Sequence, residues 1–423
     1  MTTTKNNEHK KLNFSSEREQ SQACLNSAEH EKNQGRKVLN VPNLRFKEFQ
    51  GEWEKTKFGD IATGFDYGMN AAAKNYDGLN KYIRITDIDE ASSTYTDKDI
   101  VSPDGVLTDN YLVNNRDILL ARTGASTGKS YLYKKSDGKL YYAGFLIRAN
   151  VTTHDPYFVF SQLHTHRYWR WVSIMSARSG QPGINSQEYS SFPIYTTSIE
   201  EESKIAKLLS LLDERIATQN KIIEDLKKLK SAIIEKLYSE IQGKEYSYRQ
   251  LFEIINERNN RLEFSNVLSA SQERGMVSRE DLNLDIKFER SNINTYKIVR
   301  NGDYVIHLRS FQGGFAFSNI VGVCSPAYTI MRPKDLLEYG YLSYYFTSRQ
   351  FIKSLVIVTY GIRDGRSINV DEWLDMKIVI PTKEQQRHIV RTIKVFENRI
   401  ENEEMYASCL LKQKQHLLRQ MFI

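Results

Sequence analysis

The sequence is poor in the residues that stabilise small secreted, fibrous or membrane-embedded proteins. Its 423 residues include only 3 cysteines, Cys24, Cys324 and Cys409, and no two lie near each other. A disulfide framework and a CxxC metal site are therefore excluded, and a reducing cytoplasm is the expected compartment. With 8 prolines and 22 glycines, the chain is neither proline-rich nor collagen-like. Its apolar runs are too short to span a bilayer, and its first residues lack the apolar stretch of a signal peptide.

A strong charge of one sign is also missing. The 59 Lys and Arg residues exceed the 52 Asp and Glu residues by only 7, and no segment is strongly basic alone. This balance allows a polyanionic partner but does not require one. Hydrophobic residues make up 40% of the chain, which is enough for real cores and excludes wholesale disorder. The length favours two to four domains.

Recognisable motifs of nucleotide binding and catalysis are absent from the sequence. The loop from Gly124 to Ser130 has three residues between its glycines, where a phosphate loop needs four, and a strand rather than a helix is expected after it. His164 and His166 have no third ligand at a suitable spacing and lie among aromatic residues, so we expect a structural role and no metal site. We therefore expect a non-enzymatic chain.

Two long helices divide the sequence into segments. Residues 1–40 are poor in apolar residues and are expected to form a disordered leader. Residues 198–242 and 382–423 contain almost no helix-breaking residues and begin with Ser or Thr followed by acidic residues, as helices do. Residues 41–197 and 243–381 have globular composition and are expected to form two domains that mix short strands with helices, such as those predicted at Tyr157–Ile174 and Leu336–Val356.

The two helical segments match each other when one is shifted by 184 residues. Arg215 then falls on Arg399 and Ile216 on Ile400, and the domains between them repeat more weakly at nearly the same offset. Apolar residues recur at spacings of four and three in both helices, which predicts a coiled coil. The alternative is two amphipathic helices that pack only on their own domains.

The apolar residues that recur along each helix form its seam. Polar residues interrupt both seams and predict the register in which the two helices pair. They are Gln219 and Lys230 in the first helix and Glu403 and Lys414 in the second. An unpaired buried charge is costly, so we expect Lys230 to face Glu403 and Gln219 to face Lys414.

Several loops carry side chains that suit DNA. Arginine, lysine, glutamine and asparagine contact phosphates and the edges of bases, and matching loops of the two domains contain such residues just before an Ile-Asn pair. The alternative is an ordinary turn with a polar surface. The candidate DNA-binding residues are Arg122, Thr123, Ser126, Lys129, Arg178, Gln181, Asn185, Arg309, Gln312, Arg363, Arg366 and Asn369.

The chain resembles the specificity subunits of type I restriction-modification enzymes. The resemblance covers residues 41–423 and rests on the order of its motifs, none of which is diagnostic alone. These motifs are the start ValProAsnLeuArgPheLysGluPheGlnGlyGluTrp (41–53), PheGlyAspIle (58–61) and LeuPheGluIle (251–254), AspIleLeuLeuAlaArgThrGly (117–124), the Gly…Ile-Asn loops, and ThrLysGluGlnGlnArgHisIleVal (382–390). The sequence departs from the family pattern in its long leader and in the start of the first helix, IleGluGluGluSerLysIle (199–205).

The resemblance implies an α+β fold with an internal pseudo-two-fold repeat. Two mixed α/β target recognition domains, 41–197 and 243–381, would be held apart by the antiparallel helices, and each would read one half of a split, asymmetric DNA site. It also implies two methyltransferase subunits and restriction-translocation subunits as partners, with S-adenosylmethionine, ATP and Mg²⁺ bound by those partners and no cofactor on this chain. The alternatives are a coiled-coil scaffold without a DNA role and the DNA-reading part of a methyltransferase-only complex.

Overall fold

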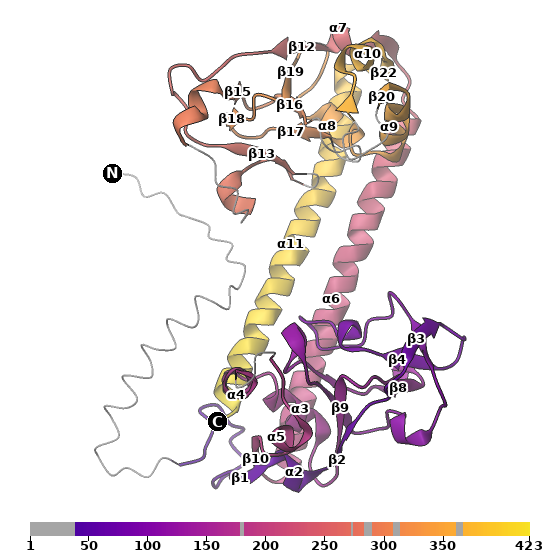
Figure 1. Cartoon of the computed structure of the whole chain (residues 1–423). Helices are drawn as coiled ribbons and strands as arrows, with labels where there is room; N and C mark the ends of the chain where they lie inside the picture. The colour runs from indigo at the N-terminus through magenta and orange to yellow at the C-terminus, as the bar shows by residue number, and fades with distance from the viewer. Residues whose placement is uncertain (1–38, 178–181, 272–273, 283–289, 308–313, 361–366) are drawn as a thin grey trace, which may run out of the picture. The chain divides into compact units, whose positions relative to one another are not determined.

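The computed structural model describes residues 39–177, 182–271, 274–282, 290–307, 314–360 and 367–423. The chain divides into two compact units, which are described separately (Figure 1). Unit 1 comprises Met1–Asp213 and Gln413–Ile423, and unit 2 comprises Glu214–Lys412. The leader expected at 1–40 lies almost entirely outside the described residues.

Unit 1 is built around a four-stranded antiparallel sheet in the order β2-β9-β6-β7. The central strand β6 is buried along its whole length, because its side chains alternate between two cores. Ile118 and Leu120 face one core, and Leu119 and Ala121 face the other. The strands are β1 (Glu54–Lys57), β2 (Ala62–Tyr67), β3 (Ala72–Asn75), β4 (Lys81–Ile83), β5 (Val101–Asp104), β6 (Asp117–Ala121), β7 (Ser130–Leu132), β8 (Leu140–Tyr142), β9 (Leu146–Val151) and β10 (Pro193–Thr196).

Short helices cover one core of unit 1. They are α2 (Phe58–Ile61), α3 (Pro156–Gln162), α4 (His166–Ser176) and α5 (Ser186–Ser190). The single helix predicted over Tyr157–Ile174 was wrong, because Thr165 caps a new helix by accepting a hydrogen bond from the amide of Tyr168. Three smaller pairings, β1-β10, β3-β5 and the parallel pair β4-β8, complete the unit.

Unit 2 has a similar order of elements, with an additional pair of short strands, β20 and β21. Its four-stranded antiparallel sheet is β12-β19-β16-β17, and β11 pairs with β22 as β1 pairs with β10 in unit 1. The helix predicted over Leu336–Val356 is also divided, because Ser348 caps the start of α9. The elements are β11 (Lys244–Ser247), α7 (Tyr248–Leu251), β12 (Phe252–Ile255), β13 (Leu268–Ser271), β14 (Gly275–Ser278), β15 (Lys297–Val299), β16 (Tyr304–Ile306), β17 (Phe315–Phe317), β18 (Gly322–Cys324), β19 (Thr329–Pro333), α8 (Tyr341–Tyr345), α9 (Arg349–Ser354), β20 (Thr359–Tyr360), β21 (Ser367–Ile368), α10 (Val370–Asp375) and β22 (Lys377–Ile380).

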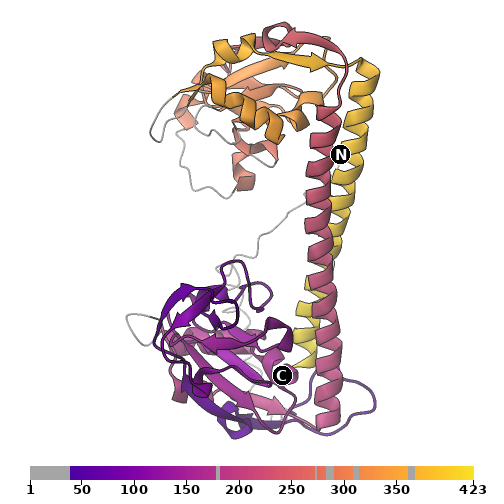
Figure 2. The same ribbon diagram turned by 90° about the vertical axis from the view of Figure 1, so that its right-hand side faces the viewer.

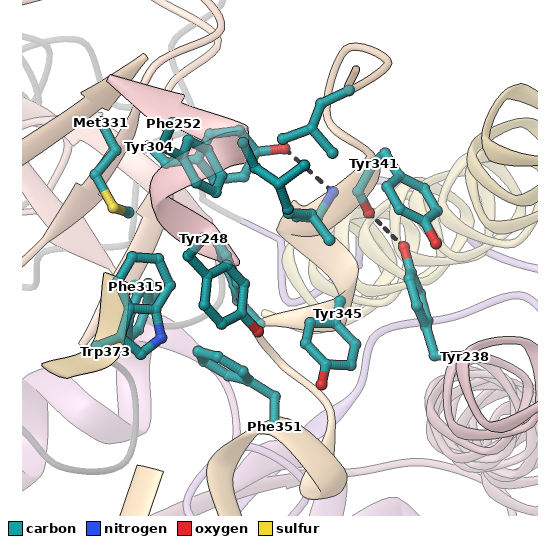
Figure 3. Close-up of a cluster of buried hydrophobic side chains, with 14 of the residues drawn as sticks. Tyr238, Tyr248, Phe252, Tyr304, Phe315, Met331, Tyr341, Tyr345, Phe351 and Trp373 are labelled. Atoms are coloured by element: carbon teal, nitrogen blue, oxygen red, sulfur yellow. Dashed lines mark hydrogen bonds between the residues drawn. The ribbon is translucent and has the colours of Figure 1, made fainter. Parts of the chain in front are cut away.

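An aromatic core joins the sheet of unit 2 to its long helices (Figure 3). Tyr248 and Trp373 stack with ring centroids 4.2 Å apart. Tyr238 of the first long helix packs against the same cluster and donates a hydrogen bond to the carbonyl oxygen of Tyr341. The core therefore fixes the end of that helix on the domain that follows it.

The two long helices are α6 (Ile199–Ser239) and α11 (Lys383–Met421), inside the ranges expected from the sequence. Within each unit their segments lie side by side (Figures 1 and 2). In unit 2, Gln219 contacts Glu403 and Lys230 contacts Glu397, so partner numbers fall along α11 as they rise along α6. The segments therefore run antiparallel. Among the described residues, no helix is long and apolar enough to cross a membrane.

The register predicted for these helices was wrong. Lys230 forms an ion pair with Glu397 (3.4 Å) instead of Glu403, and Lys414 pairs with Asp213 (2.6 Å) in unit 1 instead of Gln219. The side-chain amide of Gln219 donates hydrogen bonds to the carboxylate and carbonyl oxygen of Glu403. The prediction assumed that seam residues pair only with each other, whereas both lysines reach carboxylates beside the seam.

The predicted seam also drifts by one residue near the end of each helix. Leu209 and Ile216 are buried as expected, but beyond Ile223 the more deeply buried residue is Ile234 rather than Ile233. In α11, Leu418 is likewise more deeply buried than Leu417. A straight helix has 3.6 residues per turn and drifts away from a strict seven-residue repeat.

Two buried glutamates anchor the start of α6 in unit 1. Glu201 is held by both the Nε and an Nη of Arg45, at 2.7 Å each. Glu202, which is completely buried, accepts a hydrogen bond from the amide of Asp155 and bonds Nδ1 of His154 at 2.8 Å. The carboxylate of Glu202 raises the pKa of His154 above its ordinary value of 6.5.

We predict that replacing Gln219 with leucine destabilises the protein by about 1–3 kcal/mol. Glu403 is only 9% exposed, and the change removes the amide donor that satisfies it inside an apolar contact. Chemical denaturation measures the loss. The matched control is Asn220→Leu, at the exposed neighbouring position. Equal stability of the Gln219→Leu protein and wild type contradicts a structural role for this hydrogen bond.

We also predict that His154 makes stability depend on pH. Because the folded-state pKa is raised, its contribution is fully present below 6.5 and is lost as the pH rises through the folded pKa. Between about pH 6 and pH 9, wild type should therefore lose more stability than His154→Asn, when denaturation midpoints are compared. The exposed residue His388 supplies the control, His388→Asn. Parallel pH profiles for wild type and His154→Asn would exclude this linkage.

Candidate nucleic-acid interface

One end of the unit 1 sheet brings together two candidate loops from distant parts of the sequence. Residues 122–129 connect β6 to β7, and residues 182–185 lead into α5. The amide of Gly124 donates to the carbonyl oxygen of Pro182 (3.0 Å), and the amide of Ile184 donates to that of Arg122 (2.9 Å). The candidate residues Arg122, Thr123, Ser126 and Lys129 therefore share a surface with the segment that contains Asn185.

Two buried tyrosines hold the 122–129 loop in place. The hydroxyl of Tyr189, in α5, donates to the carbonyl oxygen of Ala121 (2.6 Å) and accepts from the amide of Gly128 (3.2 Å). The hydroxyl of Tyr168, in α4, donates to the carbonyl oxygen of Gly128 (2.8 Å). Burial raises the pKa of both hydroxyls, which therefore stay protonated. Sequence reasoning missed these residues, because more than thirty positions separate them from the loop.

The two cationic side chains of this loop, Lys129 and Arg122, differ in whether a carboxylate already pairs with them. Lys129 forms an ion pair with Glu90 (3.1 Å), and its side chain is only 18% exposed. The guanidinium of Arg122 lies 4.6 Å from the ring centroid of Tyr67 and donates weakly to the carbonyl oxygen of Gly144 (3.4 Å). Within the described part of the chain, no carboxylate forms an ion pair with Arg122. Arg122 thus keeps donors for a ligand, whereas Lys129 must first leave Glu90.

Two residues with exposed aromatic rings contact Arg122, Tyr67 through its ring and Phe145 through its backbone. Phe145 is 58% exposed and its carbonyl oxygen accepts from the amide of Arg122 (3.0 Å), while Tyr67 is 42% exposed. Exposed aromatic rings beside an arginine can contact bases and sugars. The sheet end therefore has the side-chain chemistry of a nucleic-acid surface.

The two Ile-Asn pairs begin short helices. From the sequence alone this structural role could not be distinguished from contact with DNA. Asn185 caps α5 by accepting from the amide of Glu188 (2.9 Å), and Asn369 caps α10 by accepting from the amide of Glu372 (3.3 Å). The preceding Ile184 is 2% exposed and packs in the core of its unit. Helix capping and burial are sufficient to explain the repeated pair.

The remaining candidates, Arg178, Gln181, Arg309, Gln312, Arg363 and Arg366, lie outside the described residues. The strands on either side of Arg309 and Gln312 repeat an arrangement of unit 1. Residues 308–313 connect β16 to β17, as residues 122–129 connect β6 to β7, and the amide of His307 donates to the carbonyl oxygen of Gly314 (2.8 Å). Residues 361–366 connect the paired strands β20 and β21 just before α10.

His164 has the structural environment expected from the sequence. Its ring nitrogens bond the carbonyl oxygen of Phe160 and the hydroxyl of Ser93, both at 2.9 Å. Burial lowers the pKa of His164 to about 4, so the ring is neutral at physiological pH. In the described ranges, no group of three or more His, Cys, Asp or Glu residues could hold a metal ion.

We predict that Asn185→Ala destabilises the protein by about 1 kcal/mol, whereas Asn185→Asp retains most of the stability because aspartate also caps helices. Thermal and chemical denaturation measure both changes. Gln187→Ala, at an exposed position of the same helix, is the control. An Asn185→Ala protein as stable as wild type contradicts the capping role.

Comparisons with known proteins agree with this arrangement. Residues 50–228 match the family model described as the type I restriction modification DNA specificity domain. The chain is 24% identical over 393 residues to the type I restriction enzyme MjaVIII specificity subunit of Methanocaldococcus jannaschii, covering 84% of this chain and 90% of that relative.

Two solved structures share the fold at 14% identity. One is described as the S subunit of a type I restriction-modification system from M. genitalium, with a TM-score of 0.53 over 90% of this chain and 99% of that one. The other comes from work on complex assembly and conformational transition of the type I R-M system, with a TM-score of 0.55 over 88% of this chain and 97% of that one. Residues 50–228 thus match a type I restriction modification DNA specificity domain, and most of the chain is similar to type I restriction enzyme specificity subunits.

Proposed function

We propose that this chain is the DNA-recognition subunit of a type I restriction-modification complex and reads a bipartite, asymmetric site. The observation that carries the proposal is the repetition of one sheet order, β2-β9-β6-β7 and β12-β19-β16-β17, in two units whose sequences differ. In each sheet, the candidate DNA-contacting residues fall in the sequence between the same two strands, β6 and β7 in unit 1 and β16 and β17 in unit 2. Two modules of one design with different loops suit two different half-sites.

Residues 41–197 and 243–381 act as the two target recognition domains in this proposal. Phosphate contacts give affinity, and a few arginine, glutamine or asparagine contacts to base edges give about 1–3 kcal/mol of discrimination per base pair. In the first domain the candidates are Arg122, Thr123, Ser126, Lys129, Arg178, Gln181 and Asn185. In the second they are Arg309, Gln312, Arg363, Arg366 and Asn369.

The long helices act as an antiparallel coiled coil that separates the half-sites. A helix of about 40 residues spans about 60 Å, which leaves room for unread base pairs between two contacted segments. Gln219 and Glu403 are exactly 184 positions apart, the offset of the repeat, and they bond each other. The pairs Asp213–Lys414 and Lys230–Glu397 exchange places under the same offset. These contacts support a pseudo-two-fold repeat with Gln219 and Glu403 at its centre.

The chemistry belongs to partner subunits in this proposal. Two methyltransferase subunits would bind the helices and carry S-adenosylmethionine, and restriction-translocation subunits would carry ATP and Mg²⁺, while this chain would hold no cofactor and catalyse no reaction. Exposed apolar side chains on both helices support docking of a partner. They include Leu211 (47% exposed) and Leu229 (48%) of α6, and Val395 (66%) and Met405 (63%) of α11.

Two further readings of the chain remain testable. A coiled-coil scaffold without a DNA role would show no salt-dependent shift of duplex DNA in a gel. A methyltransferase-only complex would modify DNA but would never recruit a cutting subunit. The free Arg122 and the exposed rings beside it favour DNA recognition over the scaffold.

We predict that the chain co-expressed with its methyltransferase subunits directs methylation of one bipartite motif, and that the purified chain alone methylates and cuts nothing. Sequencing that detects modified adenines defines the motif. Changing Arg178 and Gln181 to alanine should relax or abolish one half, and changing Arg363 and Arg366 the other. A double variant that alters both halves would falsify the modular reading.

A further inference from the structure

The sheet end of unit 1 contains one arginine that is held in place yet free to bind. We propose that Arg122 reads a guanine through its guanidinium fork, and that Tyr67 is the positioning residue that holds this fork flat. The inference rests on the proposed function, because it names how one half-site is read. Tyr67 is not among the DNA-binding residues that the sequence predicts.

Arg122 is held through its backbone, whereas its guanidinium keeps donors for a ligand. Its backbone is fixed on both sides, since its amide donates to Phe145 and its carbonyl oxygen accepts from Ile184. Its side chain is half-buried and, among the described residues, makes one long hydrogen bond, to Gly144, which leaves most of its five N–H donors for a ligand. Bidentate hydrogen bonding to O6 and N7 of guanine is the commonest specific contact of arginine in the major groove.

Tyr67 supports this guanidinium. Its ring lies 4.6 Å from the guanidinium carbon of Arg122, within the range of a cation–π contact. The ring is itself fixed, because the amide of Ser186 donates to its hydroxyl (3.2 Å) and the hydroxyl of Ser186 donates to the carbonyl oxygen of Phe65 (2.7 Å). Tyr67 therefore links the end of β2 to the start of α5 and limits the orientations open to Arg122.

Arg122 differs from Lys129, the other cation of the same loop. Glu90 already neutralises Lys129, and lysine presents a point charge without a planar fork. Lys129 suits a phosphate contact at most, after it leaves Glu90. Base reading by this loop is therefore assigned to Arg122.

The test uses the complex of the full chain with its methyltransferase subunits and duplexes that contain the methylated motif. Each base pair of the motif is changed singly, and binding is measured as a function of salt. Arg122→Lys keeps the charge but loses the fork, so discrimination at one G·C pair should fall about ten-fold. Tyr67→Leu should lower the same discrimination about two- to five-fold, and Tyr67→Phe should restore most of it. The salt dependence should stay unchanged in all three proteins.

The control is Tyr76→Leu, which removes another exposed tyrosine of unit 1. Uniform weakening on every duplex, with a smaller salt dependence, would make Arg122 a phosphate contact and overturn the proposal. If discrimination at the G·C pair is lost in Arg122→Lys but unchanged in Tyr67→Leu, the positioning role of Tyr67 is overturned. A wild-type complex that methylates no defined motif refutes the proposed function itself, whereas a defined motif unaffected by Arg122→Lys refutes only this inference.

Discussion

The hydrogen bond from Gln219 to Glu403 is the constraint on which the helix pairing depends. Glu403 lies in an apolar contact, where a carboxylate without partners costs several kcal/mol. Its partners are the amide of Gln219 on the facing helix and the guanidinium of Arg399 one turn away on its own helix. A shift by one heptad separates Gln219 from Glu403, so only one register satisfies both side chains.

A second set of contacts joins α6 to the globular parts. The α6 helix leads from Glu201 and Glu202, which unit 1 holds through Arg45 and His154, to Tyr238, which unit 2 holds in its aromatic core. Both ends of the helix are thus fixed by side chains buried in the neighbouring domain.

The sequence predicted the features that depend on local patterns. The long helices at 198–242 and 382–423 follow from seam spacing and the absence of helix breakers, and the strand expected after the 124–130 loop is present as β7. Features that depend on residues far apart in the chain were not predictable in this way. The ion pair of Lys230 with Glu397 requires a register that seam polarity alone does not determine, because long lysine side chains reach beyond the seam. The contact of Tyr67 with Arg122 joins residues 55 positions apart and needs the pairing of β2, β9 and β6.

In the candidate interface, the Ile-Asn motif both starts a short helix and helps to support the loop beside it. In the Ile-Asn pairs, the buried isoleucine and the capping asparagine start a short helix, and that helix carries Tyr189 in unit 1 and Trp373 in unit 2 into the core of its unit. The backbone of the 122–129 loop is therefore fixed by Tyr168 and Tyr189, which point inward, while Arg122 and Phe145 lie at its surface. When the backbone is held from inside, a surface side chain can change without altering the frame that presents it. A repeated scaffold with different surface residues can thus present two different reading surfaces with one architecture.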